Sequence, residues 1–594
     1  MDQAALDTRP RRRWKIVGWT AVTLLLIVLA AGAWVATRVL AVRDELSAVA
    51  DLQAQARDAL DDGDVPELSA LVDEMQIHTE AAASTAGDPI WRAAEILPFV
   101  GANLQAVRVV AEQFDVLSTD VAAPLVSVLG DLESRGLIAD GAIDVDLIES
   151  ARGPATQASE ALASAQERIE SLPRDSLLAD IAAGVDDVLD VTRALSVPVS
   201  SVADLTQVLP GILGSGGDRS ILVMFQNNAE LRTGGGITGT FAEIRADRGA
   251  LTIVRQADSS EFRPVDKDVL EIPSSTSEAY GDVVGRYVQN TTSTPDFDLS
   301  ARLAARWWEN LTGHSPDVVL SIDPLVLRSL LDVTGPVKLR GGAELTREDF
   351  VQDVMIAPYF RLEPKEQSAY FADLTDRFFA ALMSTDVAPS TWIEAVARPV
   401  DQGRISVWSA HDDEAAVLAG TAVAGPRARH LAAGESAFAV YLNDTTGAKM
   451  GSRLRVAMNA AATTCRDDDR PEVAIAVRLT NDAPAKAATW PLSMTGGGHW
   501  GVTPGHIGTI VTAVAPEGWF FSGVRVDGEL TGSTNVVDEG LPSSAVEVTL
   551  APGESADVEL RFTAPDTDAV EPELLHTPLI RALDDEEFAP AGCN

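Results

Sequence analysis

A run of 22 uncharged residues, IVGWTAVTLLLIVLAAGAWVAT (residues 16–37), constrains this chain more than any other feature. At 1.5 Å per residue, a helix of this length crosses a hydrocarbon layer of about 30 Å. The residues before it are basic: Arg9, Arg11, Arg12, Arg13 and Lys15. Because the positive-inside rule keeps such a flank in the cytoplasm, we expect a single-pass cell-membrane protein. Residues 1–15 would be its cytoplasmic tail, and the chain from residue 38 onward would lie outside the cell.

A cleaved signal peptide is the alternative reading of the same segment. The small residues Ala31-Gly32-Ala33 resemble a cleavage site. The apolar run is, however, longer than the roughly 7 to 15 residues of a signal-peptide core. Its length favours a retained anchor, and the sequence leaves the fate of the segment open.

The remainder of the chain is strongly acidic. The formal net charge is -42 and the sequence pI is about 4.4. No basic face could dominate such a field, so nucleic acid is excluded as a partner.

Composition divides the extracytoplasmic part into three regions. Residues 38–208 carry apolar residues at helical spacing, interrupted at Asp62-Gly63, Gly87-Asp88-Pro89, Pro98, Gly153-Pro154 and Pro173, and we expect a helical stalk or bundle. Strand and helix patterns alternate in residues 218–432, which predicts an α/β domain. From residue 436 to 594 seven short runs of period two predict a β-sandwich. The expected fold is a multidomain, membrane-anchored α+β protein.

Cys465 and Cys593 are the only cysteines. An even pair in an exported segment can form a disulfide. The sequence also allows two unpaired buried thiols.

One polar, glycine-rich stretch, QNNAELRTGGG (residues 226–236), separates two apolar runs and is expected to be a loop. The backbone N–H groups of Gly234, Gly235 and Gly236, with the guanidinium of Arg232, have the chemistry to hold an anion such as phosphate. The structural alternative is that the asparagines cap the strand, Glu230 pairs with Arg232, and the glycines only turn the chain.

Several stretches resemble a bacterial envelope family known as domain-of-unknown-function family 4012. The strongest is LVMFQNNAELRTGGGITGTFAEIRADRG. The others are DPIWRAAEILPFVG (88–101), PDVVLSIDPLVLRSLLDVTGPVKL (316–339) and VYLNDTTGAKM (440–450). The resemblance covers most of residues 40–450 and implies no particular chemistry.

The order of elements in residues 219–384 is also distantly similar to the LytR-CpsA-Psr family. Members of that family transfer lipid-pyrophosphate-linked glycopolymers to the cell wall with arginines, acidic residues and a divalent metal. The resemblance implies that Arg232, Arg361 and Arg377 hold pyrophosphate and that Asp258 either binds a metal such as Mg or acts as a base. Thr233 follows Arg232 where that family has an aspartate, so metal binding and catalysis are in question.

These patterns support three hypotheses. The first is an anchored envelope protein that binds or organises cell-wall glycopolymers or partner proteins without strong catalysis. The second is a phosphotransferase or a binder of lipid-pyrophosphate-linked glycopolymers. The third is a glycan-binding sandwich that stacks sugars on Trp490, Trp500 or Trp519, residues that core packing would also explain.

Overall fold

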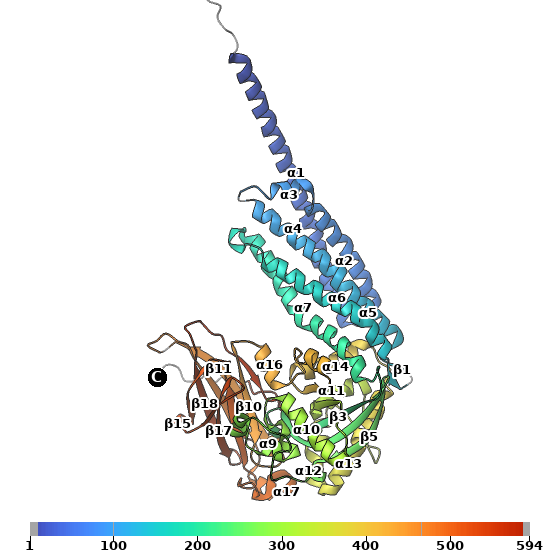
Figure 1. Ribbon diagram of the computed structural model, residues 1–594, viewed down its shortest axis with the longest axis vertical. Coiled ribbons are helices and arrows are strands. Elements are labelled where there is room, and N and C mark those ends of the chain that lie inside the picture. Colours follow the sequence, from blue (N-terminus) through green and yellow to red (C-terminus); the bar gives the residue numbers. More distant parts are fainter. Residues whose placement is uncertain (1–9, 99, 140, 465, 586–594) are drawn as a thin grey trace, which may run out of the picture. The chain divides into compact units, whose positions relative to one another are not determined.

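The computed structural model describes residues 10–98, 100–139, 141–464 and 466–585. The chain forms two compact units. One contains the residues up to Arg135 together with Glu149–Thr206, and the other contains Gly136–Ile148 and the chain from Gln207 onward. The expected mixed α/β, multidomain class is confirmed (Figure 1). Both cysteines lie outside the described residues, so the disulfide stays a prediction.

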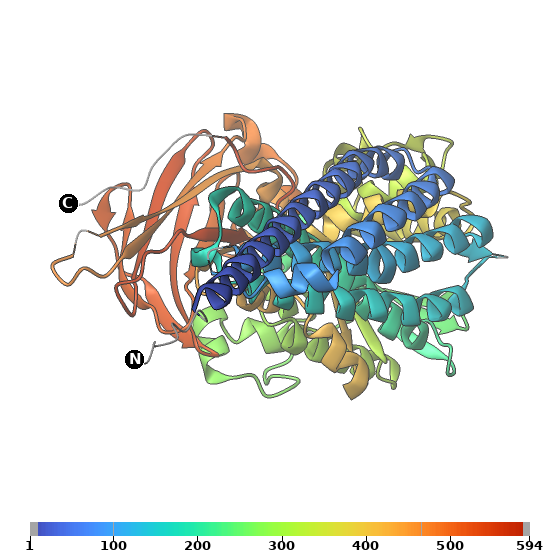
Figure 2. The same ribbon diagram turned by 90° about the horizontal axis from the view of Figure 1, so that it is seen from above.

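The first unit is built from helices that lie side by side (Figure 2), with α2 in contact with α1, α4 and α5. The helices that contribute to it are α1 (Pro10–Asp61), α2 (Val65–Ala86), α3 (Pro89–Ala94), α4 (Gly101–Val116), α5 (Ala123–Arg135), α6 (Val145–Glu170) and α7 (Ala179–Ile212). Asp64 and Asp88 cap α2 and α3 by accepting from the Glu67 and Ile90 N–H groups, which explains why the predicted breaks occur there.

The break predicted at Gly153-Pro154 is wrong, because Pro154 lies inside α6. Ala151, Ala155 and Ala158 are buried on both sides of it. Packing of this continuous small-residue face outweighs the one backbone hydrogen bond that proline removes.

The proposed membrane segment, residues 16–37, lies within α1. The side chains of residues 16–29 are outside the part that the structure describes. Within the described part, no helix combines the length and apolar character that a membrane span requires.

The second unit contains a five-stranded sheet of order β5-β4-β3-β6-β9. Its strands are β3 (Arg219–Arg232), β4 (Gly235–Asp247), β5 (Ala250–Asp258), β6 (Val318–Ile322) and β9 (Ile405–Ser409). Strands β3 and β6 are parallel and the other pairs are antiparallel. The continuous apolar run of β3 is explained by burial on both faces: Leu222 and Met224 pack in one core, and Ile221 and Val223 in the other.

Helices cover both faces of this sheet. The buried Trp307 and Trp308 of α10 (Phe297–Thr312) pack on the Leu222 face, and α11 (Pro324–Thr334) and α15 (Asp412–Leu418) contribute to the other core. The remaining helices that bear on the site are α12 (Ala357–Arg361), α13 (Pro364–Met383), α14 (Pro389–Asp401) and α16 (Pro426–Ala432).

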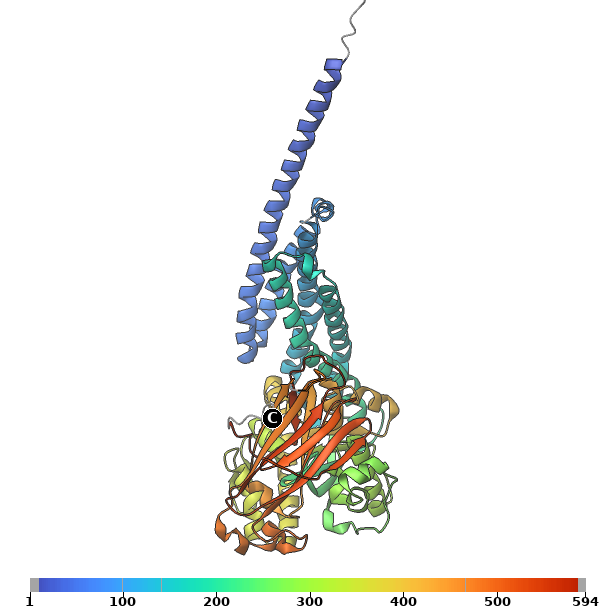
Figure 3. The same cartoon turned by 90° about the vertical axis from the view of Figure 1, so that its left-hand side faces the viewer.

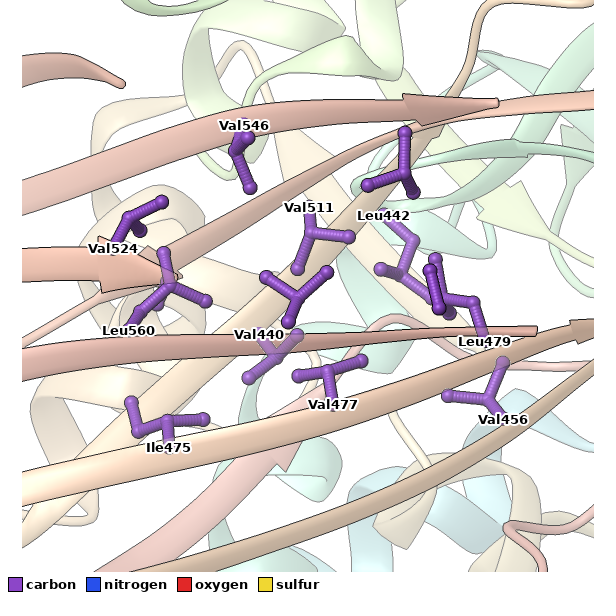
Figure 4. Close-up of a cluster of buried hydrophobic side chains, with 14 of the residues drawn as sticks. Val440, Leu442, Val456, Ile475, Val477, Leu479, Val511, Val524, Val546 and Leu560 are labelled. Carbon is purple, nitrogen blue, oxygen red and sulfur yellow. The ribbon is translucent and has the colours of Figure 1, made fainter. Parts of the chain in front are cut away.

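The C-terminal part is a β-sandwich whose strands lie side by side in Figure 3. One sheet has the order β16-β17-β13-β10-β19 and the other β11-β12-β18-β14-β15. The strands are β10 (Ala437–Asp444), β11 (Leu454–Thr463), β12 (Glu472–Asn481), β13 (Ile507–Val514), β14 (Phe520–Val526), β15 (Glu529–Leu530), β16 (Thr534–Asp538), β17 (Leu541–Leu550), β18 (Ser555–Thr563) and β19 (Glu573–His576). Their inward side chains interdigitate, as Val440, Val511 and Val477 do in Figure 4. All seven strands predicted from period two are present, and the short β15, β16 and β19 add to them.

Candidate functional site

The stretch predicted as a glycine-rich loop is mostly strand. β3 continues through Arg232, only Thr233 and Gly234 form the turn, and β4 begins at Gly235. The pairing register between β3 and β4 shifts between Asn227 and Leu231. Beyond this irregularity β3 reaches the sandwich, where Leu231 is part of the sandwich core.

Polar side chains of β3 bond to its parallel neighbour at matching positions. The Gln226 amide nitrogen donates to Ser321 Oγ at 2.6 Å, and the Asn228 amide nitrogen donates to Asp323 Oδ2 at 2.9 Å. Asn228 also donates to the Pro578 carbonyl, on the segment after β19. Asn228 therefore connects β3 to other elements instead of capping it, whereas Asn227 accepts from the nearby Ala229 N–H at 3.0 Å and also donates to Tyr359 Oη.

Asp323 is a buried carboxylate with a full set of partners. It caps α11 by accepting from the Leu325 and Val326 N–H groups, and Arg404 donates to it at 2.5 Å. Its side chain is 1% exposed. This pairing neutralises the charge where β6 ends.

A second buried charge cluster lies further along β3. Glu230 accepts from Lys449 Nζ at 2.6 Å and from Arg232 Nη2 at 3.3 Å, and all three side chains are at most 13% exposed. Burial alone would lower the pKa of Lys449, but the adjacent Glu230 carboxylate raises it overall. The predicted local pair of Glu230 and Arg232 is thus present, with Lys449 as a third member.

Each nitrogen of the Arg232 guanidinium donates to a protein acceptor. Nε donates to Asn290 Oδ1 at 3.0 Å, and Nη1 donates to the carbonyls of Leu231 and Asp444. The glycine N–H groups are engaged too, since Gly234 donates to Thr292 O and Gly236 donates to Gln226 Oε1. Protein acceptors therefore occupy most of the donors that the predicted anion cradle of Arg232 with the glycine N–H groups would use, and the cradle stays a prediction.

Close approach of backbone explains the glycines instead. A Cβ on Gly236 would lie 2.2 Å from the Asn227 carbonyl carbon, and one on Gly235, whose φ is +129°, would lie 2.5 Å from Gln226 Oε1. Only glycine fits where the shifted β3 backbone crosses so near β4.

The other residues implied by the LytR-CpsA-Psr resemblance have separate surroundings. Asp258 caps the short helix Ser259–Glu261 and accepts from Ser368 Oγ. Arg377 pairs with Asp373 at 2.7 Å within α13, and Arg361 is exposed at the end of α12. None of these three lines the cavity that Arg232 lines.

That cavity, here called the Asp444 cavity, has a volume of about 540 Å³. Its aromatic lining is Tyr280, Tyr287 and Trp500, and its polar lining includes Asn290, Asn443, Asp444 and Thr512. Trp500 is 68% exposed and packs on the turn after β10, where a Cβ on Gly447 would lie 2.1 Å from its ring. Of the other candidate sugar platforms, Trp519 is buried against Phe438 and Trp490 packs on Phe360.

Two polar atoms of this cavity are buried without a hydrogen-bond partner among the described residues: Asp444 Oδ1 and Thr512 Oγ1. The other carboxylate oxygen of Asp444 accepts from the Gly447 N–H at 2.7 Å. Burial and the nearby Glu230 raise the pKa of Asp444 to about 7, although Arg232 opposes them. Buried polar atoms are usually hydrogen-bonded, so these two atoms suit a ligand that carries hydroxyl groups.

The sequence analysis missed Asp444, Tyr280 and Tyr287. Asp444 lies in the block VYLNDTTGAKM, where the Asp-Thr-Thr-Gly turn was a local signal. Tyr280 and Tyr287 carry no local sequence signal, because they come together with Asp444 only through tertiary packing. In the described ranges, no group of three or more His, Cys, Asp or Glu side chains is arranged for a metal ion.

Comparison with known proteins supports the first resemblance. Residues 216–359 match the model of a family described as "Protein of unknown function (DUF4012)". This segment contains β3, β4 and the turn between them at Thr233 and Gly234. No curated protein matches the sequence significantly.

Substituting Gly236 by alanine tests the steric role of the glycines. We expect Gly236→Ala to lower the free energy of unfolding by about 1–3 kcal/mol or more, because the new Cβ meets backbone that cannot move aside. Gly239→Ala, in the same strand with nothing within 4 Å, should change it by less than about 0.5 kcal/mol. Urea unfolding measures both, and equal effects of the two variants would refute the steric explanation.

Asp444 should make stability depend on pH. Its pKa in the folded protein, about 7, is above the ordinary value of 3.8, so the folded state binds the proton more tightly than the unfolded state. The contribution is fully present below about pH 4 and is lost as pH rises through 7. Asp444→Asn should therefore lose less thermal stability than the unaltered protein between pH 4.5 and 7.5. Identical losses measured by circular dichroism would show that Asp444 does not titrate in this way.

Proposed function

We propose that the protein is a single-pass, membrane-anchored envelope protein that binds a saccharide unit of a cell-wall glycopolymer in the Asp444 cavity. The supporting observation is the combination of an exposed tryptophan with two buried, unpartnered oxygens in one cavity. Sugar hydroxyls can donate to Asp444 Oδ1 and exchange a hydrogen bond with Thr512, which removes the cost of leaving these atoms unpaired. The apolar face of the sugar ring can pack on Trp500.

The remaining lining fits the same chemistry. Asn290 and Asn443 supply amide groups that both donate and accept. The charges of Glu230 and Arg232 are already balanced inside the protein. A neutral, hydroxyl-rich ligand therefore suits this cavity better than an ion.

Membrane anchoring is supported by the first unit. α1 extends beyond the other helices of this unit, as Figures 1 and 3 show. The link between α3 and α4 exposes Ile96 (85%), Leu97 (56%) and Val100 (49%). Trp91 of α3 packs against α1 at Val35, Val39 and Val42, around the end of the 22-residue apolar run. The exposed apolar link between α3 and α4 therefore lies near the end of the apolar run of α1, where it could contact a lipid surface.

The phosphotransferase or lipid-pyrophosphate hypothesis remains the alternative. This hypothesis requires Arg232, Arg361, Arg377 and Asp258 to surround one ligand. In the structure, Arg232, Asp258 and Arg377 each bond to a different protein group: Asn290, Ser368 and Asp373 respectively. No observation favours it over saccharide binding, and binding to envelope partner proteins is a further possibility for the first hypothesis.

Titration with soluble cell-wall glycans tests the proposal. Peptidoglycan glycan strands and neutral wall polysaccharide fragments should bind the detergent-solubilised full chain, and Trp500→Ala should weaken binding about ten- to thirtyfold, as truncation of a central aromatic contact does. Phe520→Ala is the control, since Phe520 is 56% exposed and does not line the cavity. Isothermal titration calorimetry gives both affinities. Absence of binding, or equal loss in both variants, would reject this function.

A further inference from the structure

A second cavity, of about 510 Å³, lies in the same unit and is here called the Arg429 cavity. Its charged lining is mainly basic: Arg404, Arg429, Arg581 and the imidazole of His576 face one acidic residue, Asp401. In a chain of net charge -42, a basic cavity is unusual and points to an anionic ligand.

Two of the arginines are already neutralised. Arg404 donates to Asp323 Oδ2 and to the Leu579 carbonyl, and Arg581 donates to Asp482 at 2.6 Å. They shape the cavity, and their charges are balanced by the protein.

Arg429 differs from both. Its Nη2 donates to the backbone carbonyl of Asp401. The Asp401 charge partly opposes the effect of burial on Arg429, but no ion pair with a carboxylate forms among the described residues. Burial lowers the pKa of Arg429, as expected for a cation that lacks a full counter-charge. The guanidinium is thus a half-buried charge with capacity for an external anion.

The backbone leaves room for this arginine. Gly403, just after α14, has φ of +67°, and a Cβ there would lie 1.7 Å from Arg429 Nη1. A glycine at this position therefore lets the guanidinium lie directly on the backbone.

His576 supplies a second group. Its Nδ1 is 2.9 Å from the Thr577 carbonyl, so Nδ1 donates and Nε2 is left for a ligand. Burial, with added repulsion from Arg404 and Arg429, lowers the pKa of His576. An anion bound between Arg429 and His576 would offset this repulsion and favour the protonated ring, whose Nε2–H can then donate to a phosphate oxygen.

We propose that the Arg429 cavity binds a phosphate group, held by the Arg429 guanidinium and His576. The planar guanidinium matches the geometry of phosphate oxygens. The site is distinct from the Asp444 cavity: Arg232 lines the Asp444 cavity, and the next residue, Thr233, lines this one. The proposal does not depend on saccharide binding.

Calorimetric titration of the full chain with three probes tests the site and its source of phosphate. Inorganic phosphate represents free phosphate, pyrophosphate represents a lipid-linked precursor, and bis(glycerol) phosphate represents a polymer diester. At least one should bind, and Arg429→Gln should weaken that binding about tenfold or more, because a charge-assisted bond is lost. The probe that binds best identifies the source.

Two further variants keep the test decisive. Arg248→Gln is the control, since the Arg248 side chain is 81% exposed and does not line the cavity. His576→Gln should also weaken binding, and it guards against a fold defect of the Arg429 variant, with circular dichroism confirming that each variant is folded. Binding of no probe at millimolar concentration, or unchanged binding by folded Arg429→Gln and His576→Gln, would overturn the proposal.

Discussion

The buried cluster of Glu230, Lys449 and Arg232 is the interaction on which the second unit depends. Glu230 and Arg232 extend from the central sheet, whereas Lys449 follows β10 of the sandwich. Burying three charges is costly unless each is paired, so the cluster forms only when both parts are in place. The neighbouring Leu231 enters the sandwich core, and the central sheet and the sandwich are therefore joined by charge pairing and apolar packing at one strand end.

This junction also positions both cavities. The turn after Arg232 separates the two cavities. Asn443 fixes this turn, because it accepts from the Thr233 N–H and donates to Thr233 Oγ1. Hydrogen bonds from Arg232 to Asn290 and to the carbonyls of Leu231 and Asp444 hold the start of this turn. One cavity offers hydroxyl-binding groups beside an exposed tryptophan, and the other offers an uncompensated guanidinium.

The sequence predicted the regular elements well, because periodicity reports local burial. The alternation of strands and helices in residues 218–432 and the seven sandwich strands follow from the pattern alone. The helix break predicted at Pro154 is wrong, because packing of the alanine face of α6 outweighs the helix-breaking tendency of proline. The glycine run was read as a loop, although glycines in a strand also mark close backbone approach.

The site was harder to predict. The partners of Glu230 and Asn228 lie 219 and 350 residues away along the chain, and no local pattern encodes such contacts. The Glu230–Arg232 pair was expected because it spans two residues. Trp500 was among the expected tryptophans, but its exposure could be learned only from the structure.

A double-mutant cycle on Glu230 and Lys449 tests most directly whether this buried cluster joins the two parts. Glu230→Gln should lower the free energy of unfolding of the second unit by about 3–5 kcal/mol, since it leaves the buried Lys449 and Arg232 without their carboxylate. Lys449→Met should lower it by less, because Glu230 keeps its pair with Arg232. The double variant should lose clearly less than the sum of the two, with a coupling of about 1–3 kcal/mol. Strictly additive losses, or single variants as stable as the unaltered protein, would contradict the account.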